Sequence, residues 1–173
     1  MNDSATSSSF TFVEHWQKGD TANADAVLQF WEREGALATD AKPQERLRQV
    51  VLDARDADGR VAGVSTAVPI TLPRLGQPTY YFRCFIGKNW RKSRLVLHLL
   101  RRTYDALEDF ARQHNFPCVG VVLELENTRF GEVLQQAQWP ATAKGFVFIG
   151  KSQRGLDLRV RYFRGAKLKP AKI

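Results

Sequence analysis

The sequence has no long hydrophobic run and is poor in cysteine and histidine. In its 173 residues, no apolar stretch approaches the roughly 18 residues of a membrane span, and the N-terminus lacks a secretion-signal pattern. We therefore expect a soluble, cytoplasmic protein with no membrane partner. Cys84 and Cys118 lie in apolar, strand-like runs, which favours buried reduced thiols over a disulfide. The three histidines are scattered and predict no metal site: His15, His98 and His114.

Acidic residues are scarce in the second half of the chain. Residues 79–173 hold 18 Lys/Arg and 7 Asp/Glu, whereas residues 1–78 hold 8 and 11. Between residues 79 and 104 there are cations and no acid at all: Arg83, Lys88, Arg91, Lys92, Arg94, Arg101 and Arg102. This asymmetry predicts an anionic partner, either a phosphorylated small molecule or DNA or RNA. A solvated basic surface is the alternative, and the oligomeric state stays open.

The pattern of the chain predicts one α/β domain over residues 9–173, after a disordered tail at 1–8. Pro43 suits the first turn of a helix, and Asp58-Gly59 suits the turn of a hairpin. We expect, in order, a strand (9–16), a helix (22–37), a second helix from 43, a hairpin (50–72), a strand (79–87), a long helix (93–114), an apolar strand (118–127), a short helix (129–139) and a hairpin (146–165).

This order of elements resembles the GNAT superfamily of N-acyltransferases over almost the whole chain. The resemblance implies a mixed, mostly antiparallel central sheet of about seven strands flanked by helices. It also implies that the fourth and fifth strands, around Cys84 and Val121, diverge to open a cleft.

The loop before the long helix carries the first motif of the resemblance. The family pattern there is Arg/Gln-x-x-Gly-x-Gly/Ala, and "RKSRLV" occupies its place, with Arg91 matching and Arg94 and Val96 standing at the small positions. In the family this loop holds the pyrophosphate of coenzyme A on backbone N–H groups and the helix N-terminus. The resemblance implies that acetyl-CoA or another acyl-CoA is bound by Phe85, Ile86, Arg91, Lys92, Ser93, Arg94 and Leu95.

A second motif follows the apolar strand. "NTRFGEVLQQAQW" is similar to the family pattern Asn-x-x-Ala-x-x-Leu-Tyr-x-x-x-Gly-Phe, with Asn127 matching and Trp139 at the phenylalanine. Leu134 stands where the family has the tyrosine that commonly protonates the leaving thiolate. Because leucine carries no proton to donate, the usual reaction would need another acid or solvent.

A narrower similarity connects the chain to the Mom-type DNA-modification proteins of phages. It consists of the pair Ser93-Arg94 and the segment from Gln136 to Trp139. It implies that a protein of this shape can bind nucleic acid without the glycine loop.

Catalytic candidates are the carboxylates at the end of the apolar strand and the neighbouring Asn127. Glu124 and Glu126 lie two apart on the expected strand and so share a face. One could deprotonate an amine, or both could form salt bridges with arginines. Tyr81 and its neighbour Tyr80 are further candidates, although strand tyrosines usually pack. Trp90 could stack on a base or fill space under the loop.

The sequence thus favours a transferase that moves an acyl group from coenzyme A, or a related phosphorylated donor, to an amine. The first alternative is a nucleic-acid-binding or DNA-modifying protein on a degenerate GNAT fold. The second is a noncatalytic structural protein that reuses the fold.

Overall fold

A computed structural model describes the chain except residues 1–9, 20–22, 127–134, 143 and 171–173. Its helices are α1 (Ala24–Glu34), α2 (Pro43–Leu47), the 3₁₀ turn η1 (Lys88–Trp90) and α3 (Leu95–Gln113). Its strands are β1 (Thr11–Glu14), β2 (Val50–Arg55), β3 (Val61–Thr71), β4 (Pro78–Ile86), β5 (Gly120–Glu124), β6 (Gln138–Trp139), β7 (Phe146–Lys151) and β8 (Asp157–Tyr162). None of the described helices is long and apolar enough to cross a membrane.

The strands form one sheet in the order β1-β2-β3-β4-β5-β8-β7-β6. The pairing of β4 with β5 is parallel, while β1–β2, β2–β3, β5–β8, β6–β7 and β7–β8 are antiparallel. The expected α/β fold with a mixed, mostly antiparallel sheet is confirmed. The β4–β5 register runs from Tyr80–Val121 to Phe82–Leu123, whereas β4 itself continues to Ile86. A cleft beyond this point stays a prediction.

The chain divides into two compact units that share β3, β4 and α3. Unit 1 comprises Met1–Thr66 and Cys84–Ala106, and unit 2 comprises Ala67–Arg83 and Leu107–Ile173. The basic loop before α3 belongs to unit 1, and the carboxylates after β5 belong to unit 2. Each unit therefore carries one of the two predicted groups of functional residues.

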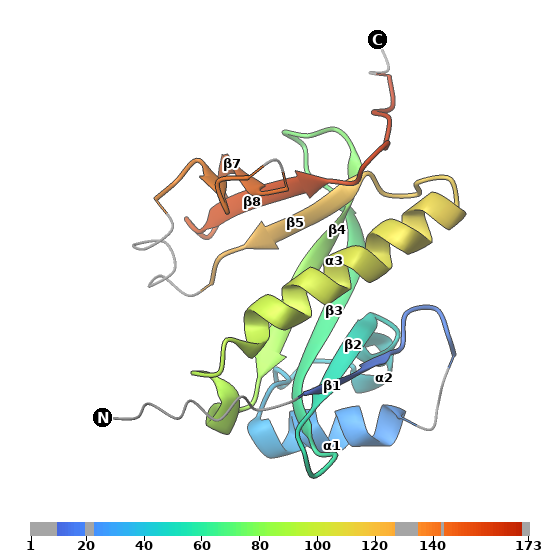
Figure 1. Ribbon diagram of the computed structural model, residues 1–173, viewed down its shortest axis with the longest axis vertical. Coiled ribbons are helices and arrows are strands. Elements are labelled where there is room, and N and C mark those ends of the chain that lie inside the picture. Colours follow the sequence, from blue (N-terminus) through green and yellow to red (C-terminus); the bar gives the residue numbers. More distant parts are fainter. Residues whose placement is uncertain (1–9, 20–22, 127–134, 143, 171–173) are drawn as a thin grey trace. The chain divides into compact units, whose positions relative to one another are not determined.

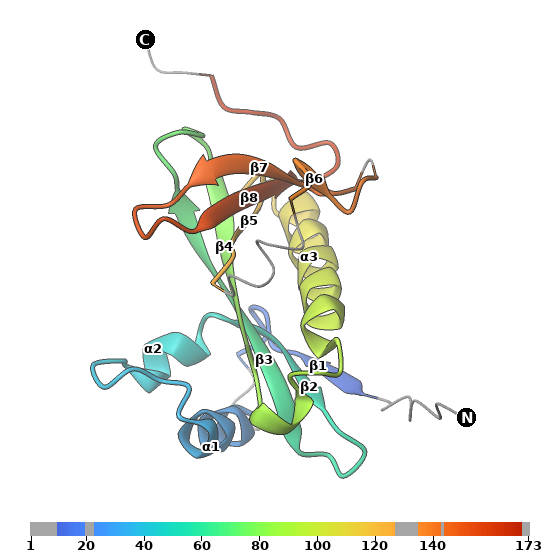
Figure 2. The same ribbon diagram turned by 90° about the vertical axis from the view of Figure 1, so that its left-hand side faces the viewer.

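Unit 1 packs helices on both faces of its strands, as Figure 2 shows for α1 and the first half of α3. On the α1 face, Val27, Phe30 and Trp31 are buried against β2 and β3. On the α3 face, a Cβ at Gly63 would lie 2.8 Å from Ile86 and 3.0 Å from Leu99. Glycine at 63 therefore lets α3 approach the sheet closely.

Unit 2 consists of the β5-β8-β7-β6 part of the sheet, the ends of β3 and β4, and the second half of α3 (Figure 1). Val122, Leu158 and Val160 form a core on one face, covered by Leu72 and Leu75 from the β3–β4 connection. The helix contributes Leu107 and Ala111, which are fully buried. Val122 therefore anchors β5 in the core of unit 2.

The prediction of a short helix over residues 129–139 is wrong for its last residues. The short helix expected over 129–139 falls largely on residues outside the described part of the chain, but residues 135–137 are not helical and Gln138–Trp139 is strand β6. Trp139 pairs with Phe146 and Gln138 with Val147. Backbone pairing with β7, and Pro140 directly after Trp139, outweigh the helical pattern of the sequence.

Candidate functional site

The predicted donor-binding residues form one continuous strand, loop and helix junction in unit 1. The strand β4 ends at Ile86, residues 87–94 form the loop that contains η1, and α3 begins at Leu95. Phe85, Ile86 and Ser93 are half-buried, and Leu95 is buried. Arg91, Lys92 and Arg94 are exposed. The apolar members therefore fix the junction, while the cations face solvent.

The start of the loop is attached to α1 and β3. The N–H of Gly87 donates to the Ala62 carbonyl at 2.9 Å, and the N–H of Lys88 donates to the Glu34 carboxylate at 3.0 Å. The bond from Lys88 lowers the pKa of Glu34, with help from Arg33 and against the effect of burial. A Cβ at Gly87 would lie 3.3 Å from both the Ala62 oxygen and the Phe30 ring. Glycine thus allows this close attachment.

Three side chains of the loop contact residues of the loop or of the segments next to it. The Ser93 hydroxyl donates to the Trp90 carbonyl at 2.6 Å. The Arg91 guanidinium lies 5.9 Å from the centroid of the Phe85 ring. Trp90 packs edge-on against Phe10, with ring centroids 5.4 Å apart, which favours the packing interpretation of Trp90 over base stacking.

Arg94 holds the last position before α3 in a left-handed conformation, with φ +60°. Glycine adopts this conformation freely, whereas other residues do so at a cost of about 1–2 kcal/mol. Arg94 also stands where the family pattern has glycine. The loop therefore has a glycine-like backbone angle at this position although its residue is arginine.

The junction suits an anion. The first N–H groups of an α-helix have no partner within the helix, and the helix dipole makes this end positive. Lys92 and Arg94, beside the first turn of α3, form no ion pair with any carboxylate that the structure describes. Residues 87–95 therefore combine uncompensated cations with a helix start, the chemistry of phosphate binding.

The second group of residues, the Glu124 cluster, lies in unit 2. Its members are Tyr81, Glu124, Glu126, Ser152 and Arg154. The Tyr81 hydroxyl donates to Glu124 in a short hydrogen bond. The Arg154 guanidinium donates to Glu124 at 3.3 Å and to Glu126 at 3.1 Å. Both glutamates therefore form the salt bridges that the sequence left as an alternative to catalysis.

The two titratable groups at the centre of this cluster have shifted pKa values. Burial alone would raise the pKa of Glu124, but hydrogen bonds from Ser152 and Tyr81 and the charges of Arg154 and Arg83 hold it below its ordinary value. Burial and the bond to Glu124 raise the pKa of Tyr81 to about 12. At neutral pH the carboxylate is charged and the phenol carries its proton. The pair can therefore present both an acceptor and a donor.

The remaining catalytic candidates are placed differently. Glu126 lies beyond the end of β5 at Glu124, and Asn127 lies outside the described residues. Tyr80 is buried, and burial raises its pKa. The roles predicted for Glu124, Glu126 and Asn127 stay predictions.

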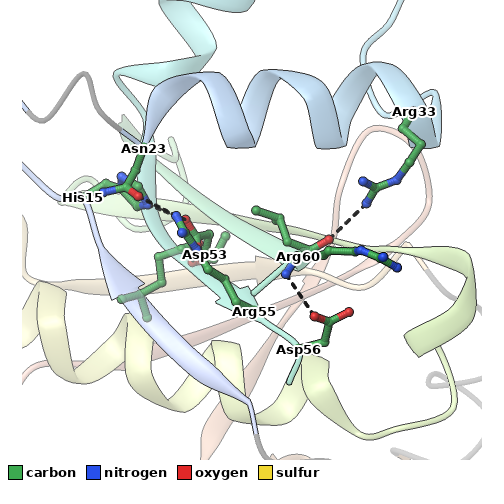
Figure 3. Close-up of polar contacts among 10 residues, drawn as sticks. His15, Asn23, Arg33, Asp53, Arg55, Asp56 and Arg60 are labelled. Atoms are coloured by element: carbon green, nitrogen blue, oxygen red, sulfur yellow. Dashed lines mark hydrogen bonds and ion pairs between the residues drawn. The ribbon is translucent and has the colours of Figure 1, made fainter. Parts of the chain in front are cut away.

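A further buried cluster joins β1, β2 and the segment before α1 (Figure 3). The Nε2 atom of His15 lies 2.8 Å from Asp53 Oδ2, and Arg55 Nε donates to Asp53 Oδ1 at 2.9 Å. Arg55 also donates to Asn23 Oδ1 at 2.6 Å. Burial would raise the pKa of Asp53, but the bonds from His15 and Arg55 lower it. The cluster connects segments of unit 1.

The cysteines behave as the sequence predicts. Both cysteines are free, without a disulfide. Cys118 is buried, and Cys84 is half-buried as a residue although its thiol lies in the interior. Burial raises the pKa of Cys84 to about 12 and that of Cys118 to about 11. Thiols with such pKa values are protonated at neutral pH and are poor nucleophiles.

Sequence reasoning missed the partners that hold these sites. Nothing near Glu34 indicated a bond to Lys88, because the residues are 54 positions apart. Likewise, Arg154 reaches Glu124 across 30 positions through the pairing of β5 with β8. For Arg94 a signal did exist, since the family pattern has glycine at that position.

Comparison with solved structures supports the fold. An acetyltransferase of the GNAT family from Streptococcus pneumoniae is 16% identical, with a TM-score of 0.57, covering 90% of this chain and 99% of that one. A GCN5-related N-acetyltransferase from Kribbella flavida is 16% identical, with a TM-score of 0.55, covering 89% and 98%. The ribosomal-protein-S18-alanine N-acetyltransferase from Escherichia coli is 12% identical, with a TM-score of 0.51, covering 90% and 93%.

No protein-family model and no curated protein sequence matches the chain. The structural likeness is therefore one of fold, and the chain has a GNAT-like fold.

Proposed function

We propose that this protein is an acyltransferase that binds a phosphorylated acyl donor, acetyl-CoA or another acyl-CoA, at residues 85–95 of unit 1. The observation that carries the proposal is the junction before α3. There, the backbone of Arg94 has φ +60°, and Lys92 and Arg94 are exposed without a described carboxylate partner. The GNAT-like fold supports it.

Each part of the junction suits the phosphates of such a donor. The N–H groups at the start of α3 would bind phosphate oxygens, and Arg94 and Lys92 would neutralise their charge. Glu34 and Gly87 would contribute by fixing the loop through Lys88 and Ala62. Phe85 and Ile86, half-buried at the end of β4, offer apolar contacts.

The acceptor in this proposal is an amine. Its nitrogen attacks the thioester carbonyl carbon and loses a proton, an N–C bond forms, and the carbon–sulfur bond breaks. The leaving thiolate gains a proton and departs as the thiol of coenzyme A. An acyl-CoA supplies the activated carbonyl for this step. Glu124 and Glu126 are the proposed proton acceptors, and Tyr81 is a protonated donor in the same cluster.

Calorimetric titration of acetyl-CoA into matched variants tests the donor site. Arg94→Glu should weaken binding at least about tenfold, since a hydrogen bond to a charged group contributes about 1.5–3 kcal/mol. Arg48→Glu is the control, because Arg48 is also an exposed arginine of unit 1 without a described ion pair. Equal losses in both variants, or no binding by the parent protein, would contradict the proposal.

A second variant separates the backbone of the loop from its charge. Arg94→Gly keeps the φ of +60° accessible and removes the whole side chain, including the guanidinium, without adding a negative charge. We expect its affinity for acetyl-CoA to lie between those of the parent and Arg94→Glu. Affinity as low as in Arg94→Glu would show that loss of the arginine side chain accounts for the whole effect and that the added negative charge contributes nothing.

A further inference from the structure

The last strand of unit 2 and the segment after it are rich in cations. Residues 158–170 contain no Asp or Glu and five cations: Arg159, Arg161, Arg164, Lys167 and Lys169. We call residues 161–170 the C-terminal basic segment. Arg164, Lys167 and Lys169 are exposed, and their side chains form no ion pair with the carboxylates in the described part of the chain. Their charge is available to a partner.

The C-terminal basic segment is attached to the domain along its length. After β8, the N–H of Phe163 donates to the Val119 carbonyl at 2.9 Å, and the N–H of Arg164 donates to the Glu108 carboxylate at 2.7 Å. Further on, the amide of Gln77 binds the backbone of Lys169 twice, accepting at 2.8 Å and donating at 3.0 Å.

These bonds distinguish the segment from a free basic tail. The side-chain amide of Gln77 pairs with the backbone of Lys169 as a neighbouring strand would. Its oxygen accepts from the N–H of Lys169, and its nitrogen donates to the carbonyl of Lys169. The backbone of Lys169 is therefore held against unit 2, while the side chains of Lys167 and Lys169 are exposed. Charges fixed in advance lose less conformational freedom when they bind, so they bind a polyanion more strongly than a flexible tail does.

The same segment also exposes two large side chains with apolar surface. Tyr162, at the end of β8, is 43% exposed, and Leu168 is 61% exposed. Both lie within the segment that supplies Arg161, Arg164 and the lysines. An aromatic ring among cations is suited to stacking on an unpaired base while the cations bind the adjoining phosphates.

We propose that the C-terminal basic segment, with Tyr162, is a binding surface for single-stranded nucleic acid. Three exposed cations lie within six residues of sequence, from Arg164 to Lys169, and this density of charge suits a polyanion. Tyr162 favours a strand with accessible bases over a duplex, whose bases are stacked on one another. This surface goes beyond the proposed donor site, and its test is independent of acyl-CoA binding.

Fluorescence anisotropy with labelled oligonucleotides of thymidine and of uridine tests the surface, and comparing the two distinguishes DNA from RNA. Between about 50 and 200 mM salt, log affinity should fall linearly with log salt, by about 0.7 for each phosphate neutralised. The variant Lys167→Gln/Lys169→Gln should reduce this slope by about 1.4 and weaken binding about 10- to 30-fold near 100 mM salt. Lys167→Arg/Lys169→Arg, which keeps both charges, should have the salt slope and the affinity of the parent protein.

Two controls make the outcome decisive. Arg48→Gln/Arg60→Gln removes the same charge from exposed arginines of unit 1 and should change the slope by much less. Tyr162→Leu keeps an apolar side chain and should weaken binding without changing the slope, because it removes stacking and no charge.

Equal slope changes in the two double variants would overturn the proposal in favour of a general basic surface. The absence of salt-dependent binding by the parent protein would also overturn it. So would binding to vesicles of anionic lipid, or to an acidic peptide, without binding to either oligonucleotide. A thermal melt of each variant identifies any loss that comes from unfolding.

Discussion

Two carboxylates, the buried Asp53 in unit 1 and the half-buried Glu124 in unit 2, are held by different kinds of partners. The Asp53 side chain is 0% exposed, and its partners His15 and Arg55 lie at the β1–β2 ladder, largely buried themselves. The Glu124 side chain is 7% exposed, but its cation partner Arg154 is 56% exposed. In both cases hydrogen bonds and positive charge lower the carboxyl pKa against the effect of burial.

The difference indicates which carboxylate is available for chemistry. Asp53 has a partner from its own strand, Arg55, and one from the end of β1, so its bonds belong to the fold. Arg154 comes from the turn between β7 and β8 and is shared between Glu124 and Glu126. A cationic ligand could replace an exposed, shared arginine at little cost, because such ion pairs are weak in water. We therefore expect Glu124 to exchange its cation partner more readily than Asp53 does.

The largest expected effect is on stability at Asp53. Asp53→Ala should lower the free energy of unfolding by about 3–5 kcal/mol, because it leaves the partly buried Arg55 without its counter-ion. Glu124→Ala should cost about 1 kcal/mol, because Arg154 remains solvated. Urea unfolding at neutral pH measures both. Similar losses of stability in the two variants would mean that Asp53 and Glu124 contribute equally to the fold.

Acid provides a second way to separate the contribution of Asp53. Its pKa in the folded protein lies below its ordinary value of 3.8, so its contribution is complete above that pH and is lost as pH falls through the folded-state pKa. Asp53→Asn should remove this part of the acid sensitivity. Urea midpoints at about pH 5, 4 and 3 should therefore fall less steeply in the variant than in the parent. Parallel curves would show that Asp53 does not contribute.

The fold was predictable where local pattern and sheet order agree. Asp58-Gly59 marks the β2–β3 turn, and Gly59 has φ +78° there, as a tight hairpin requires. Pro43 begins α2, and the apolar stripe of α3 lies within the predicted range. At Gln138 and Trp139 the prediction failed, since pairing with a strand that follows in the sequence outweighs a local helical pattern.

The candidate site was predictable only in part, for a physical reason. A loop motif is contiguous, so the sequence alone indicates that the cations from Arg91 to Arg94 lie together before α3. The partners of Glu124 depend on which strands pair. Tyr81 reaches it because β4 lies beside β5, and Arg154 because β8 lies on the other side. The left-handed angle at Arg94 is not encoded by arginine itself.

A smaller effect is expected at Tyr81. Tyr81→Phe removes one hydrogen bond to Glu124 and should lower the free energy of unfolding by about 1 kcal/mol. It should also raise the Glu124 pKa, because burial raises this pKa and one opposing bond is lost. Carboxyl-carbon NMR titration measures this shift. An unchanged Glu124 pKa would mean that the Tyr81 bond contributes nothing and that Ser152, Arg154 and Arg83 lower it.

The smallest effect on stability is expected at Arg154, and it is the sharpest test of the comparison. Arg154→Gln removes the cation that Glu124 and Glu126 share. Because the guanidinium is exposed, its ion pairs are screened at about 0.15 M salt, and the urea midpoint should scarcely move. Arg55→Gln is the matched control, and it should destabilise the protein clearly because Asp53 is fully enclosed. The Glu124 pKa should still rise in Arg154→Gln, more at low salt than at high salt, since one of the charges that lower it is lost. A loss of stability as large as that of Arg55→Gln would show that the Arg154 ion pairs stabilise the fold. Glu124 would then be a structural carboxylate like Asp53.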